Sequence, residues 1–221
     1  MAFNMGQQHH NHMPLRVGIV IFDQVEVLDV AGPFEVFSVT RLNEEQRYKE
    51  SSPFQVFLVS ENMSQVLAIG GLRFTPDVSM DNCPDLDLLI VPGGSGTRRE
   101  VDNDTLLKWI SEQAAKTRLT ASVCTGAALL GKAGLLDGRE ATTHYRAFDF
   151  LRTAAPRIKI REDVLFTLVE PIFTSAGVSA GIDLALHIVS HFFGTEVGEA
   201  TARYMEYPYP QNNQRKINRA K

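Results

Sequence analysis

The sequence predicts an α/β fold, with a doubly wound and mostly parallel sheet that carries helices on both faces. Two observations predict this fold class. First, segments 15–22 and 86–91 are nearly continuous runs of β-branched and other apolar residues, which is typical of strands covered on both faces. Second, strand-like and helix-like segments alternate along the chain, and this alternation favours right-handed crossovers between parallel strands.

The first half of the chain is expected to supply three strands, a helix and a hairpin. A turn at Asp23 precedes the helix, and Pro33 is expected in its first turn, where a missing N–H is tolerated. A glycine pair lies between two apolar runs and predicts a small hairpin or a bent excursion within 66–77. The strands are expected over 15–22, 54–59 and 86–91.

The second half is expected to contain three strand-then-helix units and a last helix over 196–205, after a break at Gly194. The units are 119–123 with 126–136, 140–143 with 145–154, and 165–174 with 178–193. No internal repeat or linker interrupts them. We therefore expect a flexible leader over 1–13, a single domain over 14–210 and a polar, basic tail over 211–221.

Composition and charge argue against several classes of protein. The 221 residues carry a net charge of -4, so no basic field would gather phosphates, and we expect no nucleic-acid binding by this chain. Cys83 and Cys124 form no disulfide framework and no signal peptide is present, which indicates the cytoplasm. No apolar run reaches the ~18 residues that suggest a membrane span.

Cys124 is the first candidate for chemistry. In doubly wound sheets, ligands bind at the carboxyl ends of the strands. Cys124 follows a predicted strand directly and precedes a helix of small residues, which is the strand–turn–helix arrangement of a nucleophile elbow. The helix N-terminus would favour thiolate over thiol. A buried core cysteine is the alternative interpretation.

Two acidic residues, Glu26 and Asp29, follow the first strand at the same edge of the sheet. Asp29 lies between Leu28 and Val30, where an unpaired buried carboxylate would be costly. A carboxyl group in contact with a thiolate would share one proton with it and so supply a nucleophile and an acid together. Capping of the helix N-terminus by Asp29 is a second interpretation that the first does not exclude.

Two further strand ends carry candidate residues. The backbone N–H groups of Gly93 and Gly94 could turn toward a bound atom without obstruction by side chains, although a tight turn is the alternative. His144 could orient a substrate or act as a base, and a structural role is about as consistent with its position. No metal site is expected, because His187 and His191 lack the glutamate of the zinc motif.

Four segments, in a characteristic order and spacing, carry a resemblance to a known family. They are Val91-Pro-Gly-Gly-Ser-Gly, Ser122-Val-Cys-Thr-Gly-Ala, the run from Gly131 to Tyr145, and Thr174-Ser-Ala-Gly-Val-Ser-Ala-Gly-Ile-Asp183. They resemble the ThiJ/PfpI superfamily of class I glutamine-amidotransferase-like proteins. The resemblance spans about residues 15–210 and implies a flavodoxin-like fold, a homodimer, and neither a metal nor an organic cofactor.

Two branches of this superfamily look most similar to the chain: isocyanide hydratase and the ligand-sensing domain of AraC-type regulators. Similarity to the hydratase, a hydro-lyase, implies that Cys124 attacks the terminal carbon of a small isocyanide and that Asp29 is the acid/base partner. Backbone N–H groups near Gly94 and Thr125 would stabilise the developing charge. The product would be an N-substituted formamide.

Other activities stay open at this point. Thr125 stands where the protease-like members place a histidine, so a peptidase would lack its general base. Glu26 could take the place of the glutamate in glyoxalase-like and deglycase-like members, which act on reactive aldehydes. Segment 31–37 looks more like the regulators. A complete regulator would need about 100 further residues after Pro210, so a non-catalytic sensor without a DNA-binding domain is the third interpretation.

Overall fold

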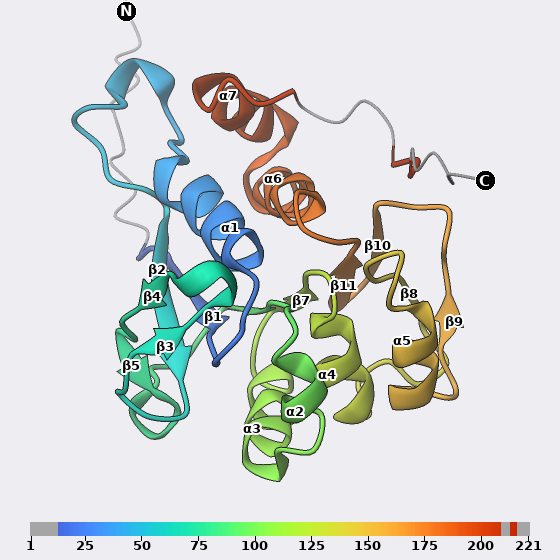
Figure 1. Cartoon of the computed structure of the whole chain (residues 1–221). Helices are drawn as coiled ribbons and strands as arrows, with labels where there is room; N and C mark the ends of the chain where they lie inside the picture. The colour runs from blue at the N-terminus through green and yellow to red at the C-terminus, as the bar shows by residue number, and fades with distance from the viewer. Residues whose placement is uncertain (1–12, 209–212, 216–221) are drawn as a thin grey trace, which may run out of the picture.

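A seven-stranded sheet forms the centre of the protein, as seen in a computed structural model that describes residues 13–208 and 213–215 (Figure 1). Its strand order is β10-β11-β7-β6-β1-β2-β5, and only the β10–β11 pair is antiparallel. The strands are β1 Leu15–Val20, β2 Phe54–Ser60, β5 Val78–Ser79, β6 Leu88–Val91, β7 Leu119–Ser122, β10 Phe166–Val169 and β11 Ile172–Ser175.

Helices cover both faces of the sheet, which confirms the predicted fold class (Figure 1). One layer contains α1 Val27–Val39, α6 Ala180–Phe193 and α7 Thr195–Tyr204. The other contains α2 Thr97–Glu100, α3 Asp104–Ala114, α4 Gly126–Lys132 and α5 Phe148–Ala154. Smaller elements are the hairpin β3 Val66–Leu67 and β4 Arg73–Phe74, the parallel pair β8 Glu140–Ala141 and β9 Lys159–Ile160, and three 3-10 turns at Glu44–Gln46, Ile69–Gly71 and Met80–Asn82.

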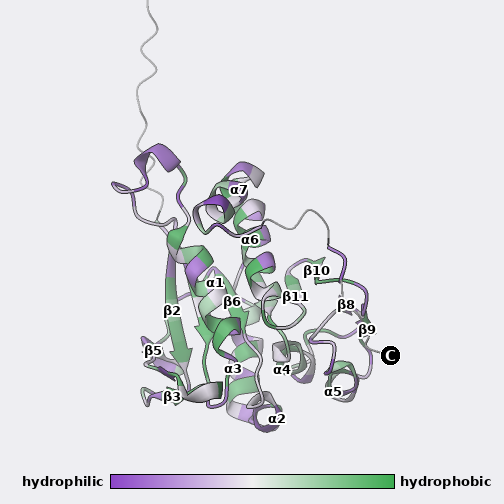
Figure 2. Ribbon diagram, turned by 45° about the horizontal axis from the view of Figure 1, so that its top comes forward, coloured by the Kyte–Doolittle hydropathy of each residue, from purple (hydrophilic) through white to green (hydrophobic). Residues whose placement is uncertain are grey.

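Burial of apolar strand residues between the two helical layers accounts for this arrangement. All four residues of β6 are buried, and Val17 and Ile19 of β1 are fully inaccessible. Each such side chain contributes about 1.5–3 kcal/mol when it leaves water. In Figure 2 the strands are predominantly green, whereas purple residues lie mainly on helices and loops at the periphery. The apolar runs of the sequence are therefore the core of the molecule.

The sheet changes its winding direction between β1 and β6. β1 leads through α1 to β2 on one side, whereas β6 leads through α2 and α3 to β7 on the other. Connections that diverge in this way leave a crevice beyond the carboxyl ends of the strands, where ligands of such folds bind. Asp29, Gly93 and Cys124 lie shortly after β1, β6 and β7, so all three come to this edge.

Several details differ from the sequence predictions. The expected strand 140–143 is the short strand β8, which pairs with β9 outside the central sheet. Pro33 lies in the middle of α1 rather than in its first turn, so the carbonyl of Asp29 four residues earlier receives no N–H from it. The expected strand 165–174 is two antiparallel strands, β10 and β11, because the chain reverses at Glu170 and Pro171. Helix α3 was not predicted, although the Asn103 side chain caps it by accepting from Leu106 N at 3.2 Å.

The ends of the domain show two further features. Residues 1–12, which make up nearly all of the expected leader, lie outside the described residues. Residues 213–215 of the expected tail lie against the segment before β10, where Leu165 N donates to the carbonyl of Asn213 at 3.0 Å.

None of the helices in the described part of the chain combines the length and apolar character needed to cross a membrane. Both cysteines are free.

Candidate functional site

Cys124 occupies a strained turn between β7 and α4. Its φ of 56° lies in the left-handed region, which non-glycine residues rarely adopt and which often marks functional sites. Cys124 N donates to the carbonyl of Ala176 at 3.2 Å, and the Thr143 hydroxyl donates to the carbonyl of Cys124 at 2.7 Å. Gly126 permits the tight turn, because a Cβ there would lie 2.0 Å from the carbonyl oxygen of Val91. The backbone therefore forms the strand–turn–helix arrangement predicted from the sequence.

Asp29 projects from the first turn of α1 and is completely buried. Its Oδ2 atom accepts a hydrogen bond from Gly93 N at 2.9 Å, whereas Oδ1 has no hydrogen-bond partner among the described residues. Burial raises the pKa of Asp29 to about 8, with a smaller contribution from the charge of Glu26, and this outweighs the Gly93 N–H and the Cys124 thiol, which lower it. Asp29 is the third residue of the helix, so the interpretation as an N-cap is wrong.

The Cys124 thiol is buried beside this carboxyl group. Burial, and secondarily the negative charge of Asp29, raises the pKa of Cys124 to about 12. The N–H and hydroxyl of Thr125 and the N–H of Val178 act in the opposite direction, because they bond to the sulfur. The expectation that the helix N-terminus would yield a thiolate is therefore wrong, since the cost of burying the charge exceeds the stabilisation from these donors. Burial thus favours the protonated form of both groups.

Gly93 and Gly94 hold the loop after β6 against both of these residues. Gly93 N bonds to Asp29, and Gly94 N donates to the Thr125 hydroxyl at 2.9 Å. Neither glycine has room for a side chain: a Cβ on Gly93 would lie 2.5 Å from Thr125 N, and one on Gly94 would lie 2.3 Å from the carbonyl oxygen of Gln24. The N–H groups directed at the sulfur belong instead to Thr125 and Val178. Stabilisation of substrate charge by the glycines stays a prediction.

Val178 is a site residue that sequence reasoning did not identify. Its φ of 34° is unusual for a β-branched residue, and it turns the N–H of Val178 toward the Cys124 sulfur. The sequence signal for this turn is the small-residue run Ser175-Ala-Gly-Val-Ser-Ala-Gly, which extends from the end of β11 to the start of α6.

Glu26 and His144 lie at the margin of the site. Among the described residues, the carboxyl group that interacts with the Cys124 thiol is that of Asp29, whereas Glu26 influences Asp29. The His144 ring packs against Gly177, and its Nδ1 atom accepts from Arg146 N at 3.3 Å; no hydrogen bond joins it to Cys124 or Asp29 in the described structure. Burial and the charges of Arg215 and Arg146 lower the pKa of His144, so its imidazole is neutral at pH 7.

A cavity of about 620 Å³ lies beside the cysteine site but does not include it. Its walls come from the residues that follow β1 and β2 and from α2 and α3, including Phe22, Glu100 and Asn103. Cys124 and Asp29 are not among its lining residues. In residues 13–208 and 213–215, the side chains of His, Cys, Asp and Glu form no group of three that could hold a metal ion.

Comparisons with known proteins agree with this architecture. The model of the DJ-1/PfpI family matches residues 15–191. Isonitrile hydratase from Pseudomonas putida is 35% identical over 196 residues, which cover 88% of this chain and 79% of that enzyme. The HTH-type transcriptional regulator GbdR from Pseudomonas aeruginosa is 30% identical over 210 residues, which cover 95% of this chain and 55% of the regulator.

A solved structure leads to the same assignment. The crystal structure of a ThiJ/PfpI family protein from Pseudomonas syringae has a TM-score of 0.77 with this chain at 26% sequence identity. The alignment covers 96% of this chain and 85% of that one. The chain therefore belongs to the DJ-1/PfpI family.

Proposed function

We propose that this protein is an isonitrile hydratase-like enzyme that adds water to a small isocyanide and releases an N-substituted formamide. The observation that carries the proposal is the buried Asp29–Cys124 pair beyond the carboxyl ends of β1 and β7. Identity of 35% to an isonitrile hydratase over most of both chains supports it. In this proposal Cys124 is the nucleophile and Asp29 transfers the protons.

The chemistry of an isocyanide suits this pair. The terminal carbon of the isocyanide must gain both a nucleophile and a proton. A thiol and a carboxylic acid must therefore both reach this carbon. Cys124 forms the S–C bond while Asp29 gives its proton to that carbon and receives the thiol proton in return. The product of this step is a covalent thioimidate, R–N=CH–S–Cys124, and Asp29 is again protonated.

Water completes the reaction with the same groups. Water adds to the thioimidate carbon while Asp29 donates a proton to the nitrogen and accepts one from the water. The C–S bond then breaks, the hydroxyl proton returns to the sulfur, and the formamide R–NH–CHO is released. The Thr125 and Val178 N–H groups face the sulfur and would stabilise the negative charge that it carries as it leaves.

The unpartnered Oδ1 atom of Asp29 supports this role. A fully buried carboxyl oxygen without a hydrogen bond is destabilising and calls for an explanation, and a catalytic role is one such explanation. A substrate or water at this position would complete its hydrogen bonding. The raised pKa keeps the proton available for transfer at neutral pH.

A small-molecule sensor is the second candidate function. The similarity to the regulator GbdR covers 95% of this chain, and Cys124 is only 6% exposed. A sensor would bind its ligand without chemical change and would tolerate a cysteine that stays protonated. Aldehyde chemistry with Glu26 as the acid receives less support, because the carboxyl group beside the sulfur is that of Asp29.

Formamide production from a simple aryl isocyanide tests the proposal. We expect turnover by the wild type, no turnover by Cys124→Ala, and unchanged turnover by Cys83→Ala. The last variant is a matched control, because Cys83 is also a free cysteine but lies before β6, away from the carboxyl ends of the strands. A folded wild type without turnover, or a Cys124→Ala variant that keeps it, would refute the hydratase assignment.

A further inference from the structure

The segment around Arg215 is attached to the loop that supports Cys124. Arg215 N donates to the carbonyl of Asp163 at 2.9 Å, and Gln214 forms an isolated antiparallel bridge with Val164. The Asn213 side chain accepts from Phe166 N at 2.9 Å. These bonds attach residues 213–215 to residues 163–166, just before and at the start of β10.

The Arg215 guanidinium bonds three acceptors on two segments. Its Nη2 atom donates to the Thr142 hydroxyl and to the Thr143 carbonyl, both at 2.8 Å, and Nε donates to the carbonyl of Val164 at 3.1 Å. Thr142 and Thr143 are almost completely buried. The guanidinium carbon also lies 5.2 Å from the centre of the Phe148 ring. A planar fork of donors suits this geometry, and a lysine cannot reproduce it.

Thr143 connects this guanidinium to the elbow. While its carbonyl accepts from Arg215, its hydroxyl donates to the carbonyl of Cys124 at 2.7 Å. The neighbouring His144 packs against Gly177, which precedes Val178 and its N–H to the sulfur. Loss of the Arg215 bonds would thus loosen segment 142–144, which would still be held by Thr142 N, a donor to the Thr174 hydroxyl at 2.8 Å.

We propose that Arg215 is a positioning residue of the cysteine site: it holds the segment 142–144 so that Thr143 maintains the left-handed turn at Cys124 and His144 maintains the Val178 N–H at the sulfur. The inference rests on the proposed function only in treating Cys124 as the nucleophile. Arg215 does not touch the reacting atoms and acts through Thr143 and His144.

The test compares Arg215→Ala with Arg161→Ala in the full chain. Arg161 is a matched control on the same edge, because it pairs with Glu140 and Asp163 but does not contact Thr142 or Thr143 through its side chain. Alkylation by iodoacetamide is followed separately at Cys124 and Cys83 by peptide mass spectrometry. Cys83 serves as an internal control, since general loosening of the fold would accelerate alkylation of both cysteines.

We expect Arg215→Ala to accelerate alkylation of Cys124 but not of Cys83, and to lower kcat by about tenfold to a hundredfold with KM nearly unchanged. Arg161→Ala should change neither quantity, and Arg215→Lys should restore only part of kcat. Equal alkylation of Cys124 in the Arg215→Ala and Arg161→Ala variants would overturn the inference, as would parallel acceleration at Cys83. If the wild type hydrates no isocyanide while Arg215→Ala still accelerates alkylation at Cys124 alone, the proposed function fails and the positioning role stands.

Discussion

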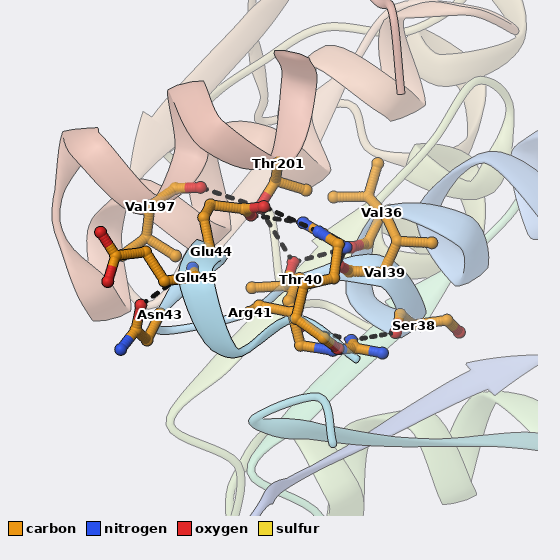
Figure 3. Close-up of polar contacts among 11 residues, drawn as sticks. Val36, Ser38, Val39, Thr40, Arg41, Asn43, Glu44, Glu45, Val197 and Thr201 are labelled. Carbon is orange, nitrogen blue, oxygen red and sulfur yellow. Dashed lines mark hydrogen bonds and ion pairs between the residues drawn. The ribbon is translucent and has the colours of Figure 1, made fainter. Parts of the chain in front are cut away.

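At its N-terminal end, helix α1 buries a carboxyl group with one oxygen unpartnered, whereas at its C-terminal end side chains bond the last carbonyls one after another (Figure 3). The Thr40 hydroxyl donates to the carbonyl of Val36 at 2.7 Å, and Arg41 donates to those of Ser38 and Thr40 at 2.9 and 2.7 Å. Helix ends require such partners, because their last carbonyls have no intrahelical donor.

Arg47 bonds to the last residue of α1 at its C-terminal end. Its guanidinium donates to the carbonyl of Val39 at 2.7 Å, forms an ion pair with Glu44, and lies 3.6 Å from the centre of the Tyr204 ring. The Thr201 hydroxyl from α7 bonds to the carbonyl of Val197 at 2.8 Å and approaches Thr40 at 3.4 Å. This end, where hydroxyl and guanidinium groups donate to backbone carbonyls, stabilises the packing of α1 against α7.

Under the proposed function, the two ends of α1 differ in the role of their polar groups, which are catalytic at the N-terminal end and structural at the C-terminal end. Saturated hydrogen bonding is typical of groups retained for stability, whereas a buried group with spare capacity costs stability and requires another explanation. At the N-terminal end, the Oδ1 atom of Asp29 could accept a further hydrogen bond, and it lies beside the strained turn of Cys124. We therefore expect substitutions at the two ends to affect activity and stability in opposite ways.

The largest effect is expected for Asp29→Asn. The amide keeps the shape of the side chain but cannot transfer protons between the sulfur and the substrate carbon, so kcat/KM for formamide production should fall by at least about a hundredfold. Glu35→Gln, at an exposed acid on the same helix, is the matched control and should keep wild-type turnover. Full turnover by Asp29→Asn would contradict the role given to Asp29.

The same substitution should change how stability depends on pH. The folded-state pKa of Asp29 is about 8, above its unfolded value, so the folded protein binds more protons and the contribution of Asp29 is present below about pH 4 and lost as pH rises toward 8. Because each pKa unit corresponds to about 1.4 kcal/mol, the free energy of unfolding of the wild type should fall by roughly 2 kcal/mol or more relative to Asp29→Asn between pH 5 and pH 8.

Urea unfolding of both proteins at the two pH values measures this difference directly. Titrating groups that do not interact with Asp29 contribute equally to the wild type and the variant, so they cancel in the comparison. Parallel pH dependence in the two proteins would show that Asp29 has an ordinary pKa and is not the buried acid required by the mechanism.

At the C-terminal end of α1, Arg47→Met should lower the free energy of unfolding of the protein without loss of turnover. The substitution removes the bonds to Val39 and Glu44, and we expect a decrease of about 2 kcal/mol in the free energy of unfolding, since Glu44 stays partly exposed to water. Lys49→Met, at an exposed neighbouring cation, should change stability much less. A loss of turnover comparable to that of Asp29→Asn would remove the distinction between the two ends.

The smallest effect is expected for Thr40→Val. Valine keeps the shape of the side chain but cannot donate to the carbonyl of Val36, so the free energy of unfolding should fall by about 1 kcal/mol. Thermal unfolding would register this as a decrease in Tm of about 2–4 °C. Thr105→Val, at an exposed position of α3, should leave Tm nearly unchanged, and an equal decrease there would indicate that the Thr40 hydroxyl has no special role.

Much of the fold and part of the candidate site were predictable because their signals are local. Apolar runs identified β1, β2, β6 and β7, and the glycine pair identified the β3–β4 hairpin. The split of 165–174 into β10 and β11 was missed, because a continuous apolar run does not reveal where the chain reverses. Helix α3 was missed although Asn103 and the spacing of its apolar residues were available as signals.

The sequence by itself determined which strand ends carry Asp29 and Cys124, because hydrophobic periodicity and turn residues act over a few neighbouring positions. Only the tertiary structure decided their protonation. Burial by distant segments raises both pKa values above what the helix N-terminus alone would produce. The tertiary structure also placed the N–H of Val178 at the Cys124 sulfur and the Arg215 guanidinium at the carbonyl of Thr143. These contacts join segments far apart in the chain, and no local pattern specifies which distant groups will share a low-dielectric environment.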